Sequence, residues 1–218
     1  FGKDKKSDVY PIRIIKNKNS IKIFVKVKNQ KIALDIKDIN IYNLLASLAV
    51  IKEFSLSLNA TKNIFKNYEL TEGRGKIHLI SRYNKKFKLV DESYNANPLS
   101  VRNAIINFNL IKKEKFKKYL ILGDMLELGH KSDKYHKDLS KVINNTNIDK
   151  VFIKGEKTLF TYKNLHKRKQ GNILQNKGDI DLVLSTIINN NDYLMIKGSN
   201  ATGLNILCQK MIKGINVI

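Results

Sequence analysis

Two carboxylates and two amides stand close together in the stretch VDESYNANPLSVRNAI, residues 90–105. A short apolar run leads into Asp91 and Glu92, and Asn95 and Asn97 follow just before a helical pattern begins. Acids at the end of a strand can accept hydrogen bonds from ribose hydroxyl groups. The N-terminus of the helix that comes next favours an anion such as a carboxylate or a phosphate. These residue types therefore indicate a site for a nucleotide or another anionic ligand at a strand-to-helix corner.

Asn97 and Pro98 also have a purely structural explanation. Asparagine is a favoured N-cap, and proline is tolerated at the first helical position, where its missing N–H is harmless. This predicts a helix over 98–109 whose apolar face carries Val101, Ala104, Ile105 and Phe108. The cap does not account for Asp91, Glu92 or Asn95, which need another explanation.

Four predicted strands end in a similar way, with acids, lysine or glycine directly after an apolar run: LVDES, LILGD, VFIKG and LMIKG. In an open α/β sheet, ligands bind beyond the carboxyl ends of the strands. Glycine and aspartate also occur in such loops for turn formation alone, but the agreement among four loops favours a binding site at this edge. Its candidate side chains are Asp91, Glu92, Asp124, Lys154, Lys197 and Ser199.

The elements that must position these side chains change character along the chain. Residues 9–36 read as short strands, because apolar and polar residues alternate there at period two. Helical patterns follow over 39–54 and 59–67. The segment ELTEGRGK, residues 69–76, then interrupts the pattern and indicates a domain boundary.

We place this boundary between residues 1–73 and 74–218. In the second part, strands alternate with helices, which predicts parallel βαβ units in a layered α/β sheet. Ser132 is expected to cap one of the helices, whose apolar face carries Tyr135, Leu139, Val142 and Ile143. Strands are predicted at 77–81, 87–90, 119–123, 150–155 and 193–198, and further helices near 179–189 and 203–213.

The net charge of +22 over 218 residues raises the question of nucleic acid or an anionic membrane as a partner. The lysines are spread along the chain, and no RRM or zinc-finger pattern occurs, so we expect neither partner. No apolar run approaches the ~20 residues of a membrane-spanning helix. The single cysteine, Cys208, falls in an apolar helical pattern and is expected in the core. The lack of a disulfide framework fits a reducing compartment and predicts a cytoplasmic location.

Six segments, in order along the chain, resemble signatures of the Mur ligase family, in the branch that adds D-alanyl-D-alanine to a UDP-muramoyl tripeptide. Their sequences are FGKDKKSDVY (1–10), NIYN (40–43), GRGK (73–76), DESYNANP (91–98), LILGDMLELG (120–129) and LMIKGSNATG (194–203). The set covers nearly the whole chain. The resemblance implies the C-terminal part of an ATP-binding central domain over 1–73, followed by a Rossmann-like C-terminal domain with a mostly parallel sheet over 74–218.

The resemblance also implies a reaction. The family uses ATP to convert the terminal carboxylate of UDP-N-acetylmuramoyl-tripeptide into an acyl phosphate. The amine of D-alanyl-D-alanine attacks the acyl phosphate, and the products are ADP, phosphate and the pentapeptide precursor of peptidoglycan. A reaction of this kind needs positively charged groups in contact with the transferred phosphoryl group, orientation of the amine, and a site closed to water.

Residue roles follow from the matched motifs. Asn40 and Asn43 would contact the adenine region, and Arg74 would reach the phosphates across the domain hinge. Asp91 or Glu92 would hold ribose; the second acid of the signature is usually Asp, which leaves open which of the two does so. Asn95 and Asn97 would position substrate or neighbouring loops, and Lys197 and Ser199 would line the second-substrate side. Arg74 and Lys197 are the residues expected to act in catalysis.

No Gly-Lys-[Ser/Thr] phosphate loop occurs in these residues. The resemblance places that loop, the Mg²⁺ ligands and the domain for the UDP group upstream of Phe1. No metal ligand is therefore assigned to this segment, and we expect it to be inactive without the remainder of the ligase chain. We expect the ligase to be a monomer.

Three alternatives stay open. Another amide ligase, adding an amino acid to a UDP-muramoyl peptide or glutamate to folate, is disfavoured by SYNAN, because those ligases carry different residues at this corner. A non-catalytic basic binding module, such as one for RNA, would bind with a steep dependence on salt. A vestigial remnant without activity is compatible with the missing phosphate loop.

Overall fold

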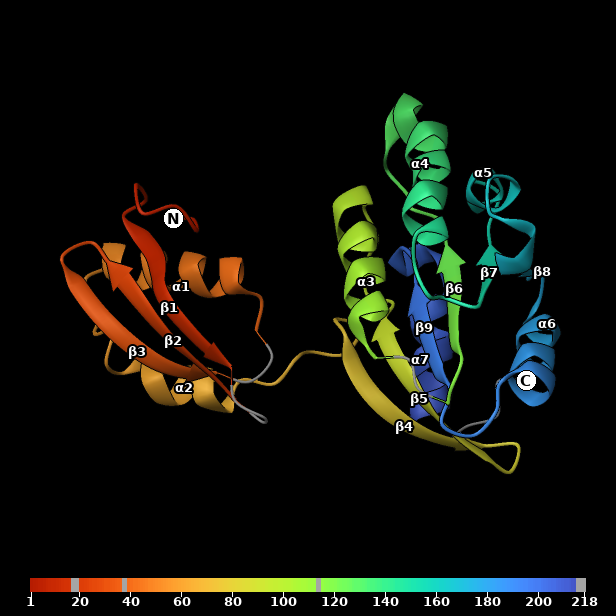
Figure 1. Ribbon diagram of the computed structural model, residues 1–218, viewed down its shortest axis with the longest axis horizontal. Coiled ribbons are helices and arrows are strands. Elements are labelled where there is room, and N and C mark those ends of the chain that lie inside the picture. Colours follow the sequence, from red (N-terminus) through yellow and green to blue (C-terminus); the bar gives the residue numbers. More distant parts are fainter. Residues whose placement is uncertain (17–19, 37–38, 113–114, 215–218) are drawn as a thin grey trace. The chain divides into compact units, whose positions relative to one another are not determined.

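The computed structural model describes residues 1–16, 20–36, 39–112 and 115–214 (Figure 1). Its internal contacts divide the chain into two compact units, Phe1–Leu70 and Thr71–Ile218. Each unit has a hydrophobic core of its own. The assignment of residues 1–73 and 74–218 to an ATP-binding and a C-terminal domain stays a prediction, because contacts do not identify domains by function.

The first unit is an antiparallel sheet of three strands packed against two helices. Alternate residues of β2 and β3 are buried, and they form one core with Leu44, Leu45 and Leu48 of α1 and Phe65 of α2. The period-two and helical patterns expected here are confirmed. The elements are β1 (Val9–Lys16), β2 (Ile21–Val27), β3 (Gln30–Ile36), α1 (Ile41–Glu53) and α2 (Thr61–Asn67).

The second unit is built on a six-stranded sheet with the order β4-β5-β9-β6-β7-β8. All neighbouring strands run parallel except β4 and β5. The strands are β4 (Lys76–Arg82), β5 (Lys85–Glu92), β6 (Lys118–Gly123), β7 (Lys150–Lys154), β8 (Gln170–Ile173) and β9 (Tyr193–Lys197). The helices are α3 (Pro98–Leu110), α4 (Ser132–Asn144), α5 (Thr158–Lys163), α6 (Lys177–Leu182) and α7 (Leu204–Ile212). The expected α/β class with a mostly parallel sheet is confirmed; α5 and β8 were not expected from the sequence.

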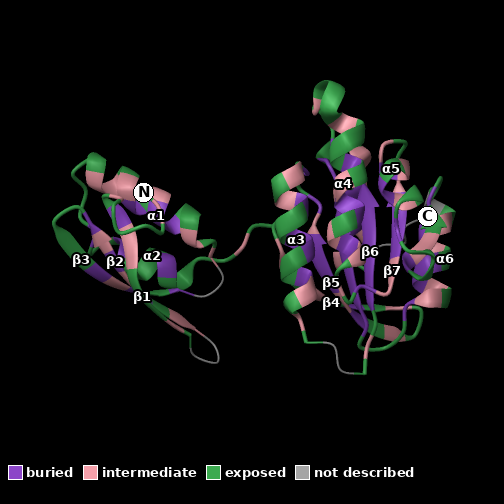
Figure 2. Ribbon diagram, turned by 45° about the horizontal axis from the view of Figure 1, so that its top comes forward, coloured by how far each residue is buried: buried purple, intermediate pink, exposed green. Residues whose placement is uncertain are grey.

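Helices cover both faces of this sheet. One core joins the sheet to α3 and α4, and the other joins it to α6 and α7. The central strands β6 and β9 are buried along their whole length, as Figure 2 shows. Cys208 lies in the second of these cores, as expected, and is fully buried. None of the described helices is long and apolar enough to cross a membrane.

The edge of the sheet is a hairpin rather than a crossover. Tyr83 and Asn84 connect β4 to β5, and both have left-handed backbone conformations, with φ of 51° and 55°. Two left-handed residues make the tight turn whose twist suits a two-residue hairpin. The hairpin places the segment that begins at Lys76 beside the carboxyl end of β5, where Lys76 pairs with Asp91.

The start of α4 differs from the sequence expectation. Ser132 is the first residue of the helix rather than its cap, because a 3-10 turn over Gly129–Lys131 runs directly into it. Tyr135 is 36% exposed, and His136 faces the core in its place. The prediction that Ser132 caps the helix was wrong, and so was the prediction that Tyr135 belongs to its buried face; Leu139 and Ile143 are buried as expected.

Candidate functional site

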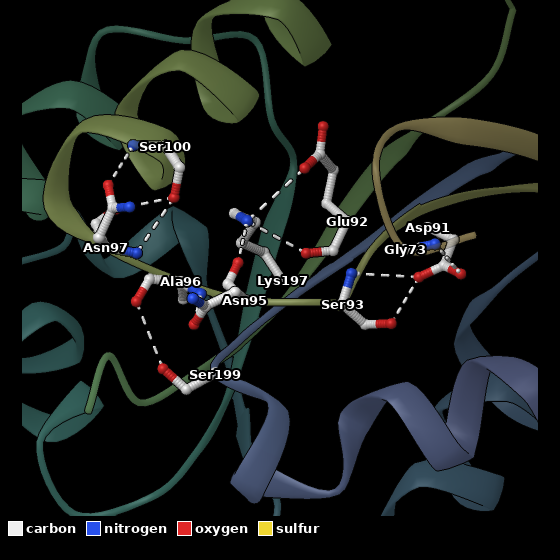
Figure 3. Close-up of polar contacts among 10 residues, drawn as sticks. All are labelled: Gly73, Asp91, Glu92, Ser93, Asn95, Ala96, Asn97, Ser100, Lys197 and Ser199. Carbon is white, nitrogen blue, oxygen red and sulfur yellow. Dashed lines mark hydrogen bonds and ion pairs between the residues drawn. The ribbon is translucent and has the colours of Figure 1, made fainter. Parts of the chain in front are cut away.

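The candidate site lies at the carboxyl end of the parallel strands, where β9 is inserted between β5 and β6. In this register Glu92 is paired with Lys197 across β5 and β9, and Leu122 is paired with Lys197 on the other side. The loop from β5 to α3 and the loop after β9 therefore meet, although they are about a hundred residues apart in the sequence. Figure 3 shows the polar contacts that join them.

Lys197 is the centre of this network. Its side chain is 3% exposed, and its Nζ donates hydrogen bonds to the backbone oxygens of Glu92 at 3.1 Å and Asn95 at 2.5 Å (Figure 3). The same Nζ lies 3.5 Å from Oε2 of Glu92, whose side chain is 24% exposed. A buried ammonium group needs such partners to compensate for its lost hydration. Lys197 thus holds the β5–α3 corner in its observed shape.

Burial acts on both members of this ion pair. It raises the pKa of Glu92 above its usual 4.5, while the charge of Lys197 opposes the rise. It lowers the pKa of Lys197 below its usual 10.5, while the charge of Glu92 opposes that change. Removal from water disfavours the charged form of either group. Ionisable groups whose pKa values are shifted by burial occur often at functional sites, and this ion pair is a candidate for that reason.

Asp91 and Glu92 differ in their accessibility. Asp91 is 2% exposed, and its two oxygens are both occupied: Oδ2 accepts from the N–H of Gly73 at 3.0 Å, and Oδ1 accepts from the N–H and the hydroxyl of Ser93 at 3.1 and 2.5 Å. The carboxylate of Glu92 forms an ion pair with Lys197, and within the described ranges no hydrogen bond encloses it as those of Asp91 do. Of the two acids that the sequence left open, Glu92 is the one whose carboxylate can meet a ligand.

Arg74 begins the segment that lies against Asp91. It is exposed and stands between Gly73 and Gly75, whose φ values of 76° and 95° lie in the left-handed region. A Cβ atom on Gly73 would lie 2.7 Å from Cβ of Tyr94, so glycine is required there by space as well as by conformation. The guanidinium therefore projects from a backbone segment that is closely fitted to the corner.

Asn95 and Asn97 are both exposed, and each has a local role. The side-chain oxygen of Asn97 accepts from the N–H of Ser100 at 2.8 Å, and the Ser100 hydroxyl accepts from the N–H of Asn97 at 3.0 Å. This reciprocal capping box and Pro98 at the helix start confirm the predicted cap. Oδ1 of Asn95 accepts from the N–H of Ala96 at 2.8 Å. The amide nitrogen of Asn95 is left to face solvent or a ligand.

Ser199 ties the neighbouring loops together. It is 4% exposed; its hydroxyl accepts from the N–H of Leu126 at 2.9 Å and donates to the backbone oxygen of Ala96 at 3.3 Å. The loop after β6 has a second support in His136, a buried residue of α4 that is not among the candidate residues. Nε2 of His136 accepts from the N–H of Met125 at 3.0 Å. Ser199 and His136 together fix how this loop borders the site.

The remaining residues of the expected site are placed as follows. Asp124 accepts from the N–H groups of Lys157 and Thr158 at 3.3 and 2.8 Å and so caps α5, an element absent from the sequence prediction. Asn40 caps α1 by accepting from the N–H of Tyr42 at 2.9 Å, and Asn43 is exposed on that helix. These two asparagines belong to the first unit, whereas the other candidates belong to the second.

A match to a protein-family model decides the family. The model, described as "Mur ligase, glutamate ligase domain", matches residues 75–200, more than half of the 218-residue chain. The chain belongs to the Mur ligase family. The matched part of this Mur ligase contains the DESYNANP corner, the loop after β6 and the end of β9. The family expected from the sequence is therefore confirmed.

The curated relatives of this Mur ligase point to one branch of the family. The chain is 26% identical to a UDP-N-acetylmuramoyl-tripeptide–D-alanyl-D-alanine ligase from Buchnera aphidicola, over 98% of this chain and 45% of the relative. It is 26% identical to the ligase of that name from Bacillus subtilis, over 80% of this chain and 38% of the relative. The chain thus spans about half the length, or less, of the curated relatives it matches.

Solved structures agree on the fold. A MurF ligase from Thermotoga maritima in complex with ADP matches with a TM-score of 0.71 and 18% identity, over 96% of this chain and 47% of that structure. MurF from Acinetobacter baumannii matches with a TM-score of 0.75 and 19% identity, over 96% of this chain and 46% of that structure. At these identities the likeness establishes the fold of the Mur ligase and not its substrates.

The residues of this Mur ligase fit part of a nucleotide site. Glu92 offers a partly exposed carboxylate for hydroxyl groups, and Arg74 offers an exposed guanidinium for phosphate oxygens. In the described ranges, no three His, Cys, Asp or Glu side chains are grouped closely enough to hold a metal ion.

Proposed function

We propose that the chain is part of a cytoplasmic ligase that uses ATP and Mg²⁺ to join D-alanyl-D-alanine to UDP-N-acetylmuramoyl-tripeptide in peptidoglycan precursor synthesis. The observation that carries the proposal is the contact between the DESYNANP corner and the end of β9, where Lys197 binds the backbone of Glu92 and Asn95. Two segments suggested by the same resemblance thus build one site. The printed names of the curated relatives support the substrates.

The reaction has two steps. The terminal carboxylate of the tripeptide attacks the γ-phosphorus of ATP, an acyl phosphate forms, and ADP leaves. The amine of D-alanyl-D-alanine then attacks the acyl carbon, an amide bond forms, phosphate leaves, and the amine gives up a proton. The first step needs positively charged groups beside the negatively charged phosphoryl oxygens. The second step needs the amine held in position to attack the carbonyl carbon.

The candidate residues of the second unit each have a proposed role in this reaction. Arg74 donates to phosphate oxygens, because a guanidinium supplies paired donors that match them. Glu92 accepts from the ribose hydroxyl groups. Lys197, expected on the second-substrate side, acts by holding the corner, since its Nζ already binds the backbone oxygens of Glu92 and Asn95.

The amine side is assigned to the loops that Ser199 joins. Asn95 has a free amide nitrogen, and the N-terminal end of α3, capped by Asn97, favours the carboxylate of D-alanyl-D-alanine. Ser199 fixes these loops relative to each other. Asn40 and Asn43 of the first unit are proposed to contact the adenine.

The test starts with the reading frame upstream of the codon for Phe1. If it encodes a G-x-x-G-K-[ST] loop, the whole protein should join D-alanyl-D-alanine to UDP-N-acetylmuramoyl-tripeptide with release of ADP and phosphate. The chain of residues 1–218 should be inactive in the same assay. Absence of ligation by the longer protein, or an upstream stop codon, would remove the catalytic proposal. The comparisons do not favour the alternative of a basic RNA-binding module, which predicts binding that weakens steeply with salt.

A further inference from the structure

The corner contains an aromatic contact that the proposed reaction has not used. Tyr94, the fourth residue of DESYNANP, is 51% exposed. The Cζ atom of Arg74 lies 4.3 Å from the centre of its ring. A guanidinium at this distance over an aromatic face is attracted by the negative face of the ring. The two side chains therefore form a stacked pair on the surface of the second unit.

The backbone beneath this pair is held without the help of the Tyr94 ring. The N–H of Gly73 donates to Oδ2 of Asp91 at 3.0 Å, and the N–H of Gly75 donates to the backbone oxygen of Asp91 at 2.7 Å. The N–H of Tyr94 donates to the backbone oxygen of Gly73 at 3.2 Å. Changing the Tyr94 side chain should therefore remove the ring and leave the position of the Arg74 backbone intact.

Whether the Arg74 guanidinium contacts an aromatic ring or a carboxylate decides how well it can bind an anion. The backbone N–H of Arg74 donates to the backbone oxygen of Thr71 at 3.3 Å. Within the part of the chain that the structure describes, the Arg74 guanidinium donates no hydrogen bond and forms no ion pair, and it contacts a neutral ring. A carboxylate partner would fix the guanidinium but would also neutralise it and occupy its donors. A ring covers one face and leaves the N–H groups at the edge free, because these lie in the guanidinium plane. The guanidinium of Arg74 is thus oriented while its N–H groups stay available, although the carboxylate of Glu92 lies close enough to interact with its charge.

We propose that Tyr94 is the positioning residue for Arg74, holding its guanidinium ready for the phosphate oxygens of a nucleotide di- or triphosphate. The proposal rests on the proposed function only in taking phosphate as the ligand of Arg74. Ordering of the long arginine side chain before binding removes part of the entropy that binding would otherwise cost. A cation–π contact at an exposed site corresponds to about a two- to fivefold effect on affinity.

The experiment follows Arg74 directly in the 218-residue chain, labelled with ¹⁵N, by NMR titration with ADP and, separately, with inorganic pyrophosphate. In the free chain, the ring current of Tyr94 should shift the side-chain protons of Arg74 upfield. Tyr94→Phe should keep this shift and the affinity for both anions. Tyr94→Leu should abolish the shift and weaken binding about two- to fivefold. Tyr135→Leu, on α4, is the matched control for loss of a partly exposed ring. It should change neither the chemical shift of the Arg74 side-chain protons nor the affinity for the anions.

A double-mutant cycle separates positioning from a general structural effect. Arg74→Ala should weaken binding of both anions, and adding Tyr94→Leu to it should cause no further loss, since the ring acts only through the guanidinium. Additive losses, unchanged affinity in Tyr94→Leu, or binding that Arg74→Ala does not weaken would each overturn the proposal. Equal losses of affinity for ADP and pyrophosphate indicate that Arg74 binds the phosphate groups alone. A loss of affinity for ADP only indicates that the nucleoside is needed to align the phosphate groups with Arg74.

This outcome is independent of the ligation assay. If the longer protein fails to join D-alanyl-D-alanine but the cycle shows coupling between Tyr94 and Arg74, the proposed function falls and the positioning role stands. If ligation occurs and the cycle shows no coupling, the proposed function stands and the positioning role of Tyr94 falls.

Discussion

Lys197 shows how a residue expected to act on substrate can act first on the protein itself. Its ammonium group is buried and bound to the backbone oxygens of Glu92 and Asn95, and the carboxylate of Glu92 completes its surroundings. The same geometry decides between the two acids: Asp91 is enclosed by Gly73 and Ser93, so Glu92 is left to face a ligand. The chemistry of each residue follows from which partners the fold has already given it.

Replacing Lys197 with methionine should lower the free energy of unfolding by about 2–4 kcal/mol, because two backbone oxygens and a partly buried carboxylate would lose a charged partner. Urea denaturation at pH 7 measures this change. Lys141→Met is the matched control: Lys141 is also paired with an acid, Asp138, but its side chain is 77% exposed, and the loss should be about 0–1 kcal/mol. Adding Glu92→Gln to Lys197→Met should recover part of the loss; a loss no larger than that of the control would contradict the assigned role.

The pKa of Glu92 gives a prediction about pH. Burial raises it above 4.5 in the folded chain, so the folded state binds this proton more tightly than the unfolded state. Stability from this group must therefore increase as pH falls through the folded pKa, and level off below 4.5 where both states are protonated. The unfolding free energy of the wild type minus that of Glu92→Gln should rise between pH 7 and about 4.5, as urea titrations at several pH values would record. A difference that falls instead would mean that attraction to Lys197 outweighs burial.

At the scale of elements, the site depends on how β9 and α3 are arranged around the corner. Insertion of β9 between β5 and β6 brings the loops of three strands to one place. Helix α3 starts abruptly, because Asn97 and Ser100 satisfy each other's backbone N–H groups. A helix that begins at a fixed residue keeps its free N–H groups directed at the same point, which the proposed carboxylate site requires.

Asn97→Ala should therefore lower the free energy of unfolding by about 0.5–2 kcal/mol through loss of the cap. Asn103→Ala is the matched control, since Asn103 is exposed in the interior of the same helix, where alanine is the better helix former. This control should be neutral or slightly stabilising. Chemical denaturation of both variants makes the comparison, and equal effects would show that the capping box does not stabilise α3.

At the scale of the whole molecule, the chain is two structures in sequence. Among the described residues, Phe1–Leu70 and Thr71–Ile218 each bury a set of side chains of their own. In the proposed reaction, ATP and the peptide must be enclosed while the amine attacks, and movement of one domain relative to another is a common way to exclude water. A chain of two independently packed units is suited to such movement.

Limited proteolysis should cut the chain between α2 and β4, where Glu69 and Glu72 are both exposed. A glutamate-specific protease at low concentration should release two fragments, and both should keep their secondary structure in far-UV circular dichroism. The reason is that each unit packs a hydrophobic core of its own. Digestion that passes directly to small peptides, without stable fragments, would show that the units depend on each other for stability.

The sequence by itself determined the class of the fold, the family and the order of most of the elements. Local patterns suffice for these: the alternation in β2 and the stripe and cap of α3 are properties of a few neighbouring residues. The same reasoning failed at Ser132, where a preceding 3-10 turn took the place of a cap, and it did not reach α5 or β8. Only the tertiary structure decided that Lys197 lies beside Glu92, that Asp91 is enclosed and that Arg74 stacks on Tyr94. The physical reason is that burial and hydrogen bonding are settled by competition among all groups that meet, and Lys197 meets a partner 105 residues away.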